Sequence, residues 1–315
     1  MNHIPWVEKY RPQNFDDIIL EEQNQIILQN MLEQNRIPNM LFYGPPGTGK
    51  TTTIINLINE YQKKNNECYR ELVIHLNASD DRGIDIIRNQ ISTFTTSAYL
   101  FNKGSKFIVL DEIDYMTKTA QIALYNLIKN NTENVRFCLI CNYISKLDRS
   151  LQNACMSFKF NSLPRDKITD FLGNILFKEN LNGLLKERKK VFIENLIDNY
   201  KSDVRSMINH IQSSYQNNTL NTKIMSTNDI EQLVSFFLKE NRTIAESEKK
   251  MVSCLKIYNI EKQEMVVKII NYVLSKYPLN DKLIDFVRVS IRYNNFYLPE
   301  FNIFFISKIV SLLSD

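Results

Sequence analysis

Four short apolar runs alternate with helix-like segments in the first half of the chain. The runs are Met40–Tyr43, Leu72–Leu76, Phe107–Leu110 and Phe137–Cys141. Nearly every position in them is apolar, as in strands that are buried on both faces of a sheet. Strands that alternate with helices predict a parallel sheet. We therefore expect an α/β domain over residues 1–162.

The pattern changes after Pro164, where helical periodicity replaces the strand signals. Helices are expected over Asp166–Lys178, Lys189–Tyr200 and Asp203–Ser214. These segments predict a small helical domain over residues 163–222, which ends in a polar linker around residues 216–219.

A third domain, entirely helical, is expected over residues 223–315. Ile230, Leu233, Val234 and Phe237 fall at positions i, i+3, i+4 and i+7, the spacing of one helix face. A second pattern of this kind begins at Met265.

Composition narrows the class of protein only slightly. The 315 residues are 43% hydrophobic and 23% charged, which is ordinary for a soluble globular protein of two or three domains. The net charge of +4 does not by itself indicate a nucleic-acid partner.

No export or membrane segment is expected. The amino terminus lacks the basic and apolar regions of a signal peptide. The most apolar late stretch, Phe301–Leu313, contains Asn302, Ser307 and Lys308, and is shorter than the roughly 20 residues of a membrane span. We expect a soluble intracellular protein with no membrane partner.

The five cysteines do not suggest disulfides or a metal site. Their number is odd and their spacing irregular, which fits a reducing compartment. Cys138 and Cys141 form a CxxC pair inside an apolar run, where a structural role fits better than zinc or redox chemistry.

A phosphate-binding motif of the form G-x-x-x-x-G-K-[ST] follows the first predicted strand. It consists of Gly44, Pro45, Pro46, Gly47, Thr48, Gly49, Lys50 and Thr51, and it leads into a helical stretch that begins at Thr52. Backbone N–H groups and the helix N-terminus can hold phosphates there, while Lys50 reaches the outer phosphates. Thr51 would ligate Mg²⁺. A purely structural glycine-rich turn is the alternative interpretation.

An acidic motif at the end of the third predicted strand argues against that alternative. The segment Ile108–Asp114 is an apolar strand that ends in carboxylates. This arrangement predicts Asp111 beside the metal and Glu112 where it can orient or deprotonate an attacking water. The alternative is a pair of acids that caps a helix.

Two more polar residues fit a hydrolysis site. Asn142 directly follows the strand ending at Cys141, at the edge of the sheet where ligands gather in open α/β folds. Arg205 begins a predicted helix and could reach the phosphates across a cleft. Neither residue would identify the site by itself.

Two longer motifs resemble hallmarks of replication factor C small subunits, which are AAA+ ATPases of sliding-clamp loaders. These motifs are Pro5–Pro12 and Leu76–Asp85. The resemblance covers about residues 4–215, in the family's order. Within it, Leu41–Gly44, Cys141–Tyr143 and Phe158–Phe160 look most like the subunit 3 type.

The resemblance implies an AAA+ P-loop α/β fold with a helical lid domain and a C-terminal helical collar that mediates oligomerisation. It implies ATP and Mg²⁺ as cofactors and a hetero-pentamer with other replication factor C subunits. That assembly would open a sliding clamp and load it onto primer–template DNA. The chain would act in the nucleus of a eukaryote or in the replication compartment of a virus.

The resemblance also assigns roles to individual residues. Val7, Tyr10, Arg11 and Pro12 would line the adenine pocket, although a surface tether is the alternative for that segment. Arg82 and Arg88 would grip DNA phosphates without reading bases, or they form an ordinary solvated helix face.

The chain departs from the family pattern at a functional position. Where most small subunits carry Ser-Arg-Cys, with an arginine that reaches the neighbouring ATP site, this chain has Asn153-Ala154-Cys155. An arginine finger can be worth about 10³–10⁵ in rate. Arg149 is a conceivable substitute, but five helical residues turn it to another face. The neighbouring site is therefore expected to be inert or served by another residue.

Two other functions stay open at this point. One is a subunit that holds ATP as a structural component with little hydrolysis, which Ala154 favours and Glu112 opposes. The other is a different AAA+ machine that processes DNA. That machine would need a DNA-reading or motor element, whereas residues 229–315 show only helical periodicity.

Overall fold

The computed structural model describes residues 4–66, 69–79, 87–96, 104–130, 134–185, 188–216, 219–220, 224–239, 243–258, 260–278, 280–294 and 301–313. Contacts divide the chain into two compact units. The first contains Met1–Lys186 and Tyr200–Leu220, and the second contains Glu187–Asn199 and Asn221–Asp315. The expected domain boundaries at residues 162 and 222 remain predictions.

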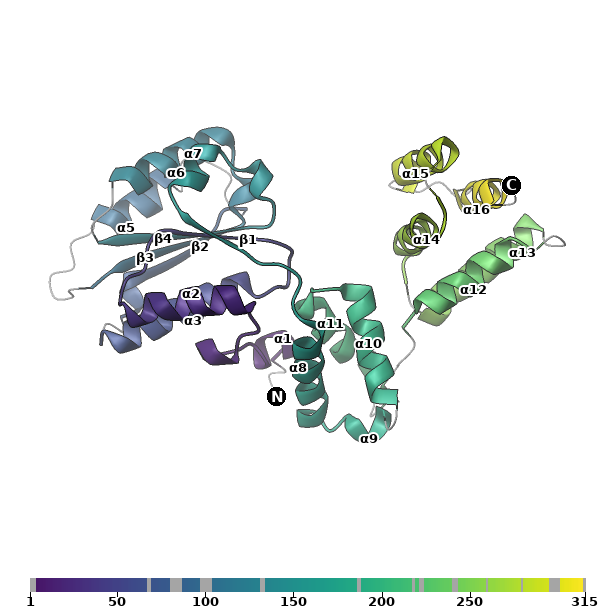
Figure 1. Cartoon of the computed structure of the whole chain (residues 1–315), viewed down its shortest axis with the longest axis horizontal. Helices are drawn as coiled ribbons and strands as arrows, with labels where there is room; N and C mark the ends of the chain where they lie inside the picture. The colour runs from purple at the N-terminus through teal and green to yellow at the C-terminus, as the bar shows by residue number, and fades with distance from the viewer. Residues whose placement is uncertain are drawn as a thin grey trace. The chain divides into compact units, whose positions relative to one another are not determined.

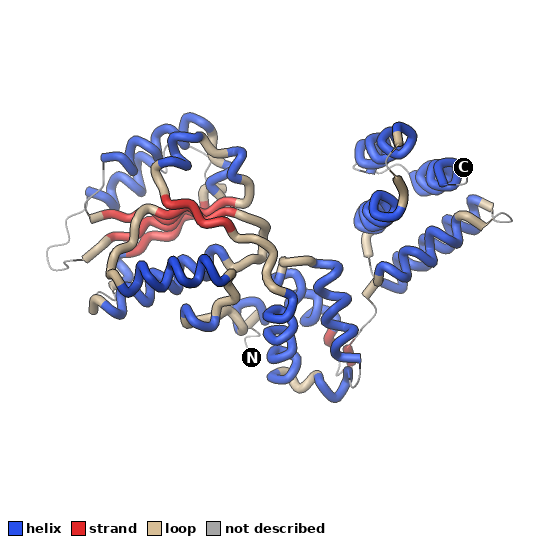
Figure 2. The backbone as a smooth tube through the Cα atoms, viewed as in Figure 1, coloured by secondary structure: helices blue, strands red, loops and turns tan. Residues whose placement is uncertain are grey.

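A five-stranded parallel sheet forms the centre of the first unit (Figure 2). Its strands are β1 (Met40–Tyr43), β2 (Val73–Asn77), β3 (Lys106–Asp111), β4 (Val135–Cys141) and β5 (Met156–Lys159), in the order β2-β3-β4-β1-β5. The four strands expected from the apolar runs are confirmed. The sequence did not indicate β5, because only Phe158 of its four residues is buried.

Helices cover both faces of this sheet (Figure 1). On one face lie α2 (Glu22–Glu33) and α3 (Lys50–Lys64); on the other lie α5 (Ser92–Thr96), α6 (Lys118–Asn130) and α7 (Arg149–Asn153). Alternate strand residues point to opposite faces, so two separate cores result. Leu57 of α3 packs in a cluster with Phe42, whereas Leu124 of α6 packs in a cluster with Leu139. This α/β architecture matches the expected fold class.

The two cysteines of the CxxC pair belong to different cores. Cys138 lies in the cluster beside α3, and Cys141 lies in the cluster beside α6. Both thiols are buried. Because residues three apart on a strand point to opposite faces of the sheet, the two sulfur atoms cannot form one ligand pair.

Several further helices and short elements complete the first unit. They are α1 (Trp6–Lys9), η1 (Phe15–Asp17), η2 (Arg70–Leu72), η3 (Ile87–Ile91), η4 (Ile113–Tyr115), η5 (Ile144–Lys146), α8 (Arg165–Lys178), α9 (Asn182–Leu185), α11 (Val204–Ser214), β6 (Tyr215–Gln216) and β7 (Thr219–Leu220). The helices expected at α8 and α11 are confirmed. The sequence did not indicate the antiparallel pair of β6 and β7, because strands of two residues are too short to leave a pattern. The expected linker around residues 216–219 remains a prediction.

The second unit is helical in its described residues. It contains α12 (Thr227–Phe237), α13 (Ile244–Tyr258), α14 (Lys262–Lys276), α15 (Asp281–Asn294), α16 (Phe301–Leu313) and nearly all of α10 (Lys189–Tyr200). Ser226 and Asp229 form a reciprocal capping box at the start of α12. The helical periodicity expected from residue 230 onward is confirmed.

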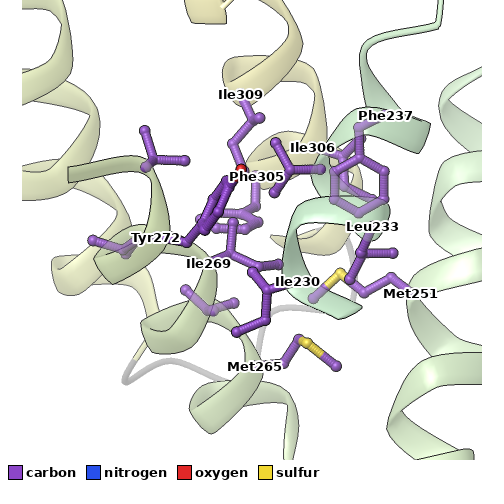
Figure 3. Packing of buried hydrophobic residues seen from close by; sticks show 14 of the residues in the cluster. Ile230, Leu233, Phe237, Met251, Met265, Ile269, Tyr272, Phe305, Ile306 and Ile309 are labelled. Carbon is purple, nitrogen blue, oxygen red and sulfur yellow. The ribbon is translucent and has the colours of Figure 1, made fainter. Parts of the chain in front are cut away.

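Apolar side chains from α12, α13, α14 and α16 meet in a single core (Figure 3). The residues Ile230, Leu233 and Phe237 that share one face of α12 all point into it. Among the described residues, no helix combines the length and apolar character that a bilayer crossing requires.

Candidate nucleotide-binding site

The phosphate-binding motif joins the end of β1 to the start of α3, as the sequence predicts. Gly44 and Gly47 have φ angles of 144° and 71°. A Cβ atom at Gly47 would lie 2.0 Å from Asp203 Oδ1, and one at Gly44 would lie 2.1 Å from Phe160 O. Glycine is therefore required at both positions by backbone conformation and by close approach of other chain segments.

Lys50 is the first residue of α3 and its side chain is buried beneath the loop. The ammonium group donates to Gly44 O at 2.8 Å and to Pro45 O at 2.7 Å. Burial lowers the pKa of Lys50, and the carboxylate of Asp111 acts in the opposite direction. The cation is thus held at the N-terminus of a helix, where the helix dipole also favours an anion.

Thr51 and Asp111 bring two oxygen ligands together next to the lysine. Thr51 Oγ1 donates to Asp111 Oδ2 at 2.7 Å, while Asp111 Oδ1 accepts the N–H of Glu112 at 2.8 Å. Mg²⁺ prefers oxygen ligands and is commonly held by one or two protein groups together with substrate phosphates. A hydroxyl and a carboxylate at this spacing fit such an ion.

Glu112 follows β3 in a left-handed backbone conformation with φ 58° and ψ 35°. It precedes the short helix η4, but its side chain makes no capping hydrogen bond there. The interpretation that this acid only caps a helix is therefore not supported. Glu112 instead lines the same cavity as Lys50 and Thr51.

Asn142 and Arg205 reach this cavity from two other elements. Asn142 directly follows β4; its N–H donates to Asp114 Oδ1 at 3.5 Å, and the next N–H donates to Asp114 Oδ2 at 3.3 Å. Arg205 lies in the first turn of α11, whose N-terminus is capped by Asp203. Both residues line the cavity.

The amino-terminal segment closes another side of the cavity. Arg11 Nε donates to Thr52 Oγ1 at 3.3 Å, and Asn56 Nδ2 donates to Pro12 O at 2.9 Å. Both partners belong to α3, the helix that begins at the phosphate-binding loop. A simple surface tether would not require these contacts.

One cavity of about 220 Å³ gathers most of the residues that the sequence singled out. Those that line it are Val7, Tyr10, Arg11, Pro12, Pro46, Gly47, Thr48, Gly49, Lys50, Thr51, Thr52, Asp111, Glu112, Asn142 and Arg205. Gly44 and Pro45 act behind it by accepting from Lys50. The arrangement combines a cation, a helix N-terminus, two oxygen ligands and a carboxylate, which suits binding and cleavage of a nucleoside triphosphate.

Several lining residues escaped sequence reasoning. They are Glu8, Ile18, Ile19, Leu163, Phe171, Val204 and Ile208. Most are apolar and lie far apart in the sequence, so no local pattern sets them apart from core residues. The neighbours Val7, Tyr10 and Arg205 were the only signal that these segments approach the site.

Comparison with known proteins agrees with this geometry. The model of the ATPase family associated with various cellular activities matches residues 40–162. The probable replication factor C subunit 5 of Dictyostelium discoideum is 39% identical over 250 residues, which cover 76% of this chain and 70% of that protein. The chain belongs to the replication factor C subunit family.

Other replication factor C subunits match a shorter region. Replication factor C subunit 3 of Saccharomyces cerevisiae is 44% identical over 213 residues, covering 67% of this chain and 60% of that protein. Replication factor C subunit 5 of Homo sapiens is 40% identical over 214 residues, covering 68% of this chain and 61% of that protein. The chain thus spans about 60% of the length of these two relatives. The name of the Saccharomyces cerevisiae relative agrees with the resemblance to the subunit 3 type.

Ala154 and Arg149, at and near the position of the family's arginine, do not line the cavity. Arg82 is outside the described residues, and Arg88 belongs to the short helical turn η3. Ala154, at the position of the family's arginine, follows the last residue of α7 and is half-buried. Arg149 is exposed at the first position of α7.

Proposed function

We propose that this chain binds ATP with Mg²⁺ and hydrolyses it as a subunit of a sliding-clamp loader. The observation that carries the proposal is the convergence of Lys50, Thr51, Asp111, Glu112 and Arg205 on one cavity. Three segments distant in sequence contribute the groups that phosphoryl transfer needs. The family match supports the same activity.

The phosphate-binding loop would hold the β- and γ-phosphates. Backbone N–H groups of the loop donate to phosphate oxygens, and Lys50 exchanges its bonds to Gly44 and Pro45 for bonds to the outer phosphates. Thr51 and Asp111 would hold Mg²⁺, which neutralises the charge that develops on the phosphates. Arg205 would add a second positive charge from α11.

Glu112 would act as the general base or as the group that orients the attacking water. Its carboxylate lies in the same cavity as Thr51 and Asp111. Asn142, held in place through its backbone by Asp114, would hydrogen-bond that water or the γ-phosphate. These positions divide the cavity into a metal side and a water side.

The adenine end would lie against the amino-terminal segment. Val7, Tyr10, Arg11 and Pro12 supply an apolar and aromatic surface, and Ile18, Leu163 and Phe171 extend it. Apolar walls with a few polar groups are typical of sites for planar ligands.

The proposal extends to the assembly. The chain would join other replication factor C subunits in a hetero-pentamer through a collar at residues 223–315, with a lid at residues 163–222. The pentamer would open the sliding clamp and load it onto primer–template DNA, where Arg82 and Arg88 would contact phosphates. Names of relatives as replication factor C subunits support this, as do the family-like motifs Pro5–Pro12 and Leu76–Asp85. The corresponding location is the nucleus or a viral replication compartment.

Two measurements test the proposal. ATP binding is measured on the full chain, and ATP hydrolysis is measured on the assembly reconstituted with partner subunits, clamp and primed DNA. Lys50→Ala should abolish binding, whereas Glu112→Gln should retain binding and lower the chain's share of hydrolysis by about 10²–10⁴. Hydrolysis that is unaffected by Glu112→Gln would leave the chain as a binding subunit, and absence of ATP binding by the native chain would refute the proposal.

A further inference from the structure

Glu179 joins the end of α8 to the amino-terminal segment. One carboxylate oxygen, Oε1, accepts hydrogen bonds from Lys9 Nζ at 2.6 Å and from Tyr10 Oη at 2.5 Å. The side chain of Glu179 is only 16% exposed. The bond from Lys9 is exposed to solvent, whereas the bond from Tyr10 is partly buried. A partly buried hydrogen bond of this length to a carboxylate is stronger than an ordinary surface ion pair.

Stability of α8 does not explain a carboxylate at this position. Glu179 is the residue that follows the last turn of α8, with its own N–H bonded back to the helix. The carboxyl end of a helix dipole disfavours negative charge and favours cations such as the adjacent Lys178. The acid is therefore better explained by its two partners from the amino-terminal segment than by the helix that carries it.

Those two bonds fix the ring of Tyr10. Lys9 and Lys178 place their ammonium groups 5.3 Å and 5.9 Å from the centroid of this ring, and Trp6 meets it edge-on at 6.4 Å. Burial, followed by the hydrogen bond to Glu179, raises the pKa of Tyr10, so its hydroxyl remains a donor. Tyr10 lines the cavity described above.

The other end of the segment is attached independently. Arg11 and Pro12 are bonded to Thr52 and Asn56 of α3, the helix that begins at the phosphate-binding loop. Loss of the Glu179 bonds would therefore free the side chain of Tyr10 while Arg11 and Pro12 stay attached to α3. Within the adenine end, Tyr10 and the pair Arg11 and Pro12 are thus held by different parts of the fold.

We propose that Glu179 is a positioning residue that holds Tyr10 at the base end of the nucleotide site and so sets how much the base contributes to ATP affinity. The inference rests on the proposed function and adds to it a residue outside the cavity. Glu179 touches no part of the nucleotide; it acts through the phenol of Tyr10.

The test compares ligands with and without a base on the full chain. Dissociation constants are measured for ATP and for inorganic tripolyphosphate, each with Mg²⁺. Glu179→Ala should weaken ATP binding roughly tenfold, the loss expected for a hydrogen bond to a charged group, and leave tripolyphosphate binding unchanged. Glu179→Gln, which keeps an acceptor oxygen, should recover most of the loss.

Two further variants separate positioning from general stability. Tyr10→Phe keeps the ring but removes the donor, so it should reproduce the loss, and combining it with Glu179→Ala should add little. Glu60→Ala, which removes an exposed acid paired with Lys63 on α3, should change neither constant.

Each remaining outcome is decisive. If the native chain binds neither ligand, the proposed function fails. If the native chain binds both and Glu179→Ala weakens both equally, weakens neither, or adds fully to Tyr10→Phe, the positioning role is refuted. Thermal unfolding of each variant identifies any that fail to fold. If Glu179→Ala fails to fold, the dissociation constants of Tyr10→Phe and Glu179→Gln are compared with those of the native chain instead.

Discussion

Thr51 donates a hydrogen bond of 2.7 Å to the carboxylate of Asp111. The contact joins the first turn of α3 to the end of β3, sixty residues later in the chain. Because the second oxygen of Asp111 holds the N–H of Glu112, the pair also fixes the start of the turn that carries the candidate base. The proposed metal ligand Thr51 and the proposed base Glu112 are thus bonded to the same carboxylate.

Removing the hydroxyl of Thr51 should make nucleotide binding less sensitive to Mg²⁺. Thr51→Val keeps the shape of the side chain, so ATP affinity in a chelator should stay near that of the native chain. The additional affinity that Mg²⁺ confers should fall about tenfold or more, since an oxygen ligand is lost. Titration calorimetry with and without Mg²⁺ measures both values.

Thr53→Val is the matched control for that experiment. Thr53 lies two residues further along α3, is buried, and donates its hydroxyl to Gly49 O at 2.9 Å. Its loss should lower the free energy of unfolding by about 1 kcal/mol and leave the Mg²⁺ dependence intact. A Thr51→Val chain with native Mg²⁺ dependence would show that Thr51 is not a metal ligand.

A methyl group at Gly47 should disturb the site more than its size suggests. The added Cβ would meet Asp203 Oδ1 at 2.0 Å and Asp203 Cα at 2.7 Å, and φ is 71°. Because Asp203 caps α11, Gly47→Ala should displace the helix that carries Arg205, weaken ATP binding, and cost about 1–3 kcal/mol of stability. Chemical denaturation and ATP titration measure the two effects.

Gly183→Ala provides the comparison within the same unit. Gly183 lies in α9, and nothing lies within 4 Å of an added Cβ. This change should raise the free energy of unfolding by about 0.4–1 kcal/mol and leave ATP binding unchanged. Equal effects from the two glycine substitutions would contradict the packing of Gly47 against Asp203.

Buried thiols should make the first unit less stable at high pH. Burial raises the pKa of Cys141 to about 12 from 9.0, and it does the same for Cys155, which is half-buried. Above pH 9 the unfolded chain loses thiol protons that the folded chain retains, so the free energy of unfolding falls as pH rises toward 12. At pH 10 the loss is about 1.4 kcal/mol for each thiol.

Substitution of Cys141 separates its contribution to the pH dependence of the free energy of unfolding from the contributions of other groups. Urea unfolding of Cys141→Ala should show a weaker decline between pH 8 and pH 10 than the native chain, even though the variant is less stable at pH 8. In the native fold, alkylation of Cys141 at pH 9 should be slow, and mass spectrometry resolves this for each cysteine. Rapid alkylation of folded Cys141 would contradict the buried, protonated state.

Restoring an arginine at position 154 tests whether the sequence change has silenced a neighbouring ATP site. In the reconstituted assembly, Ala154→Arg should raise clamp- and DNA-stimulated hydrolysis about tenfold or more at that site, since an arginine finger is worth about 10³–10⁵. Asn153→Arg puts the charge about 100° away around the helix and should have no such effect. An unchanged rate with Ala154→Arg would mean that no hydrolysis was lost there.

Sequence patterns predicted the layered fold because buried strands and amphipathic helices leave strong periodic signals. The strands β1 to β4 and the helices α8, α10 and α11 lie where apolar runs and helical spacing indicated. β5 left no such signal, since Met156, Ser157 and Lys159 are exposed and its one buried residue is Phe158. An edge strand of this kind is defined by pairing with β1, which sequence periodicity does not encode.

The phosphate end of the site was predictable and much of its support was not. Lys50, Thr51, Asp111 and Glu112 occur in two short motifs whose spacing carries their chemistry. Glu179, by contrast, meets Lys9 across 170 residues. The contact between Glu179 and Lys9 depends on how α8 packs on the amino-terminal segment, and no local sequence pattern indicates this packing.

The left-handed backbone at Glu112 limits which residues this position can accept. A residue with a Cβ atom adopts a φ angle near 58°, as Glu112 does, at a cost of about 1 kcal/mol or more in free energy. The cost is greatest for β-branched residues. Glycine or asparagine would relieve that cost but would remove the carboxylate. A chain that no longer needed hydrolysis could therefore gain stability by a single replacement here. The proposed base therefore keeps its carboxylate at a position where the backbone is strained.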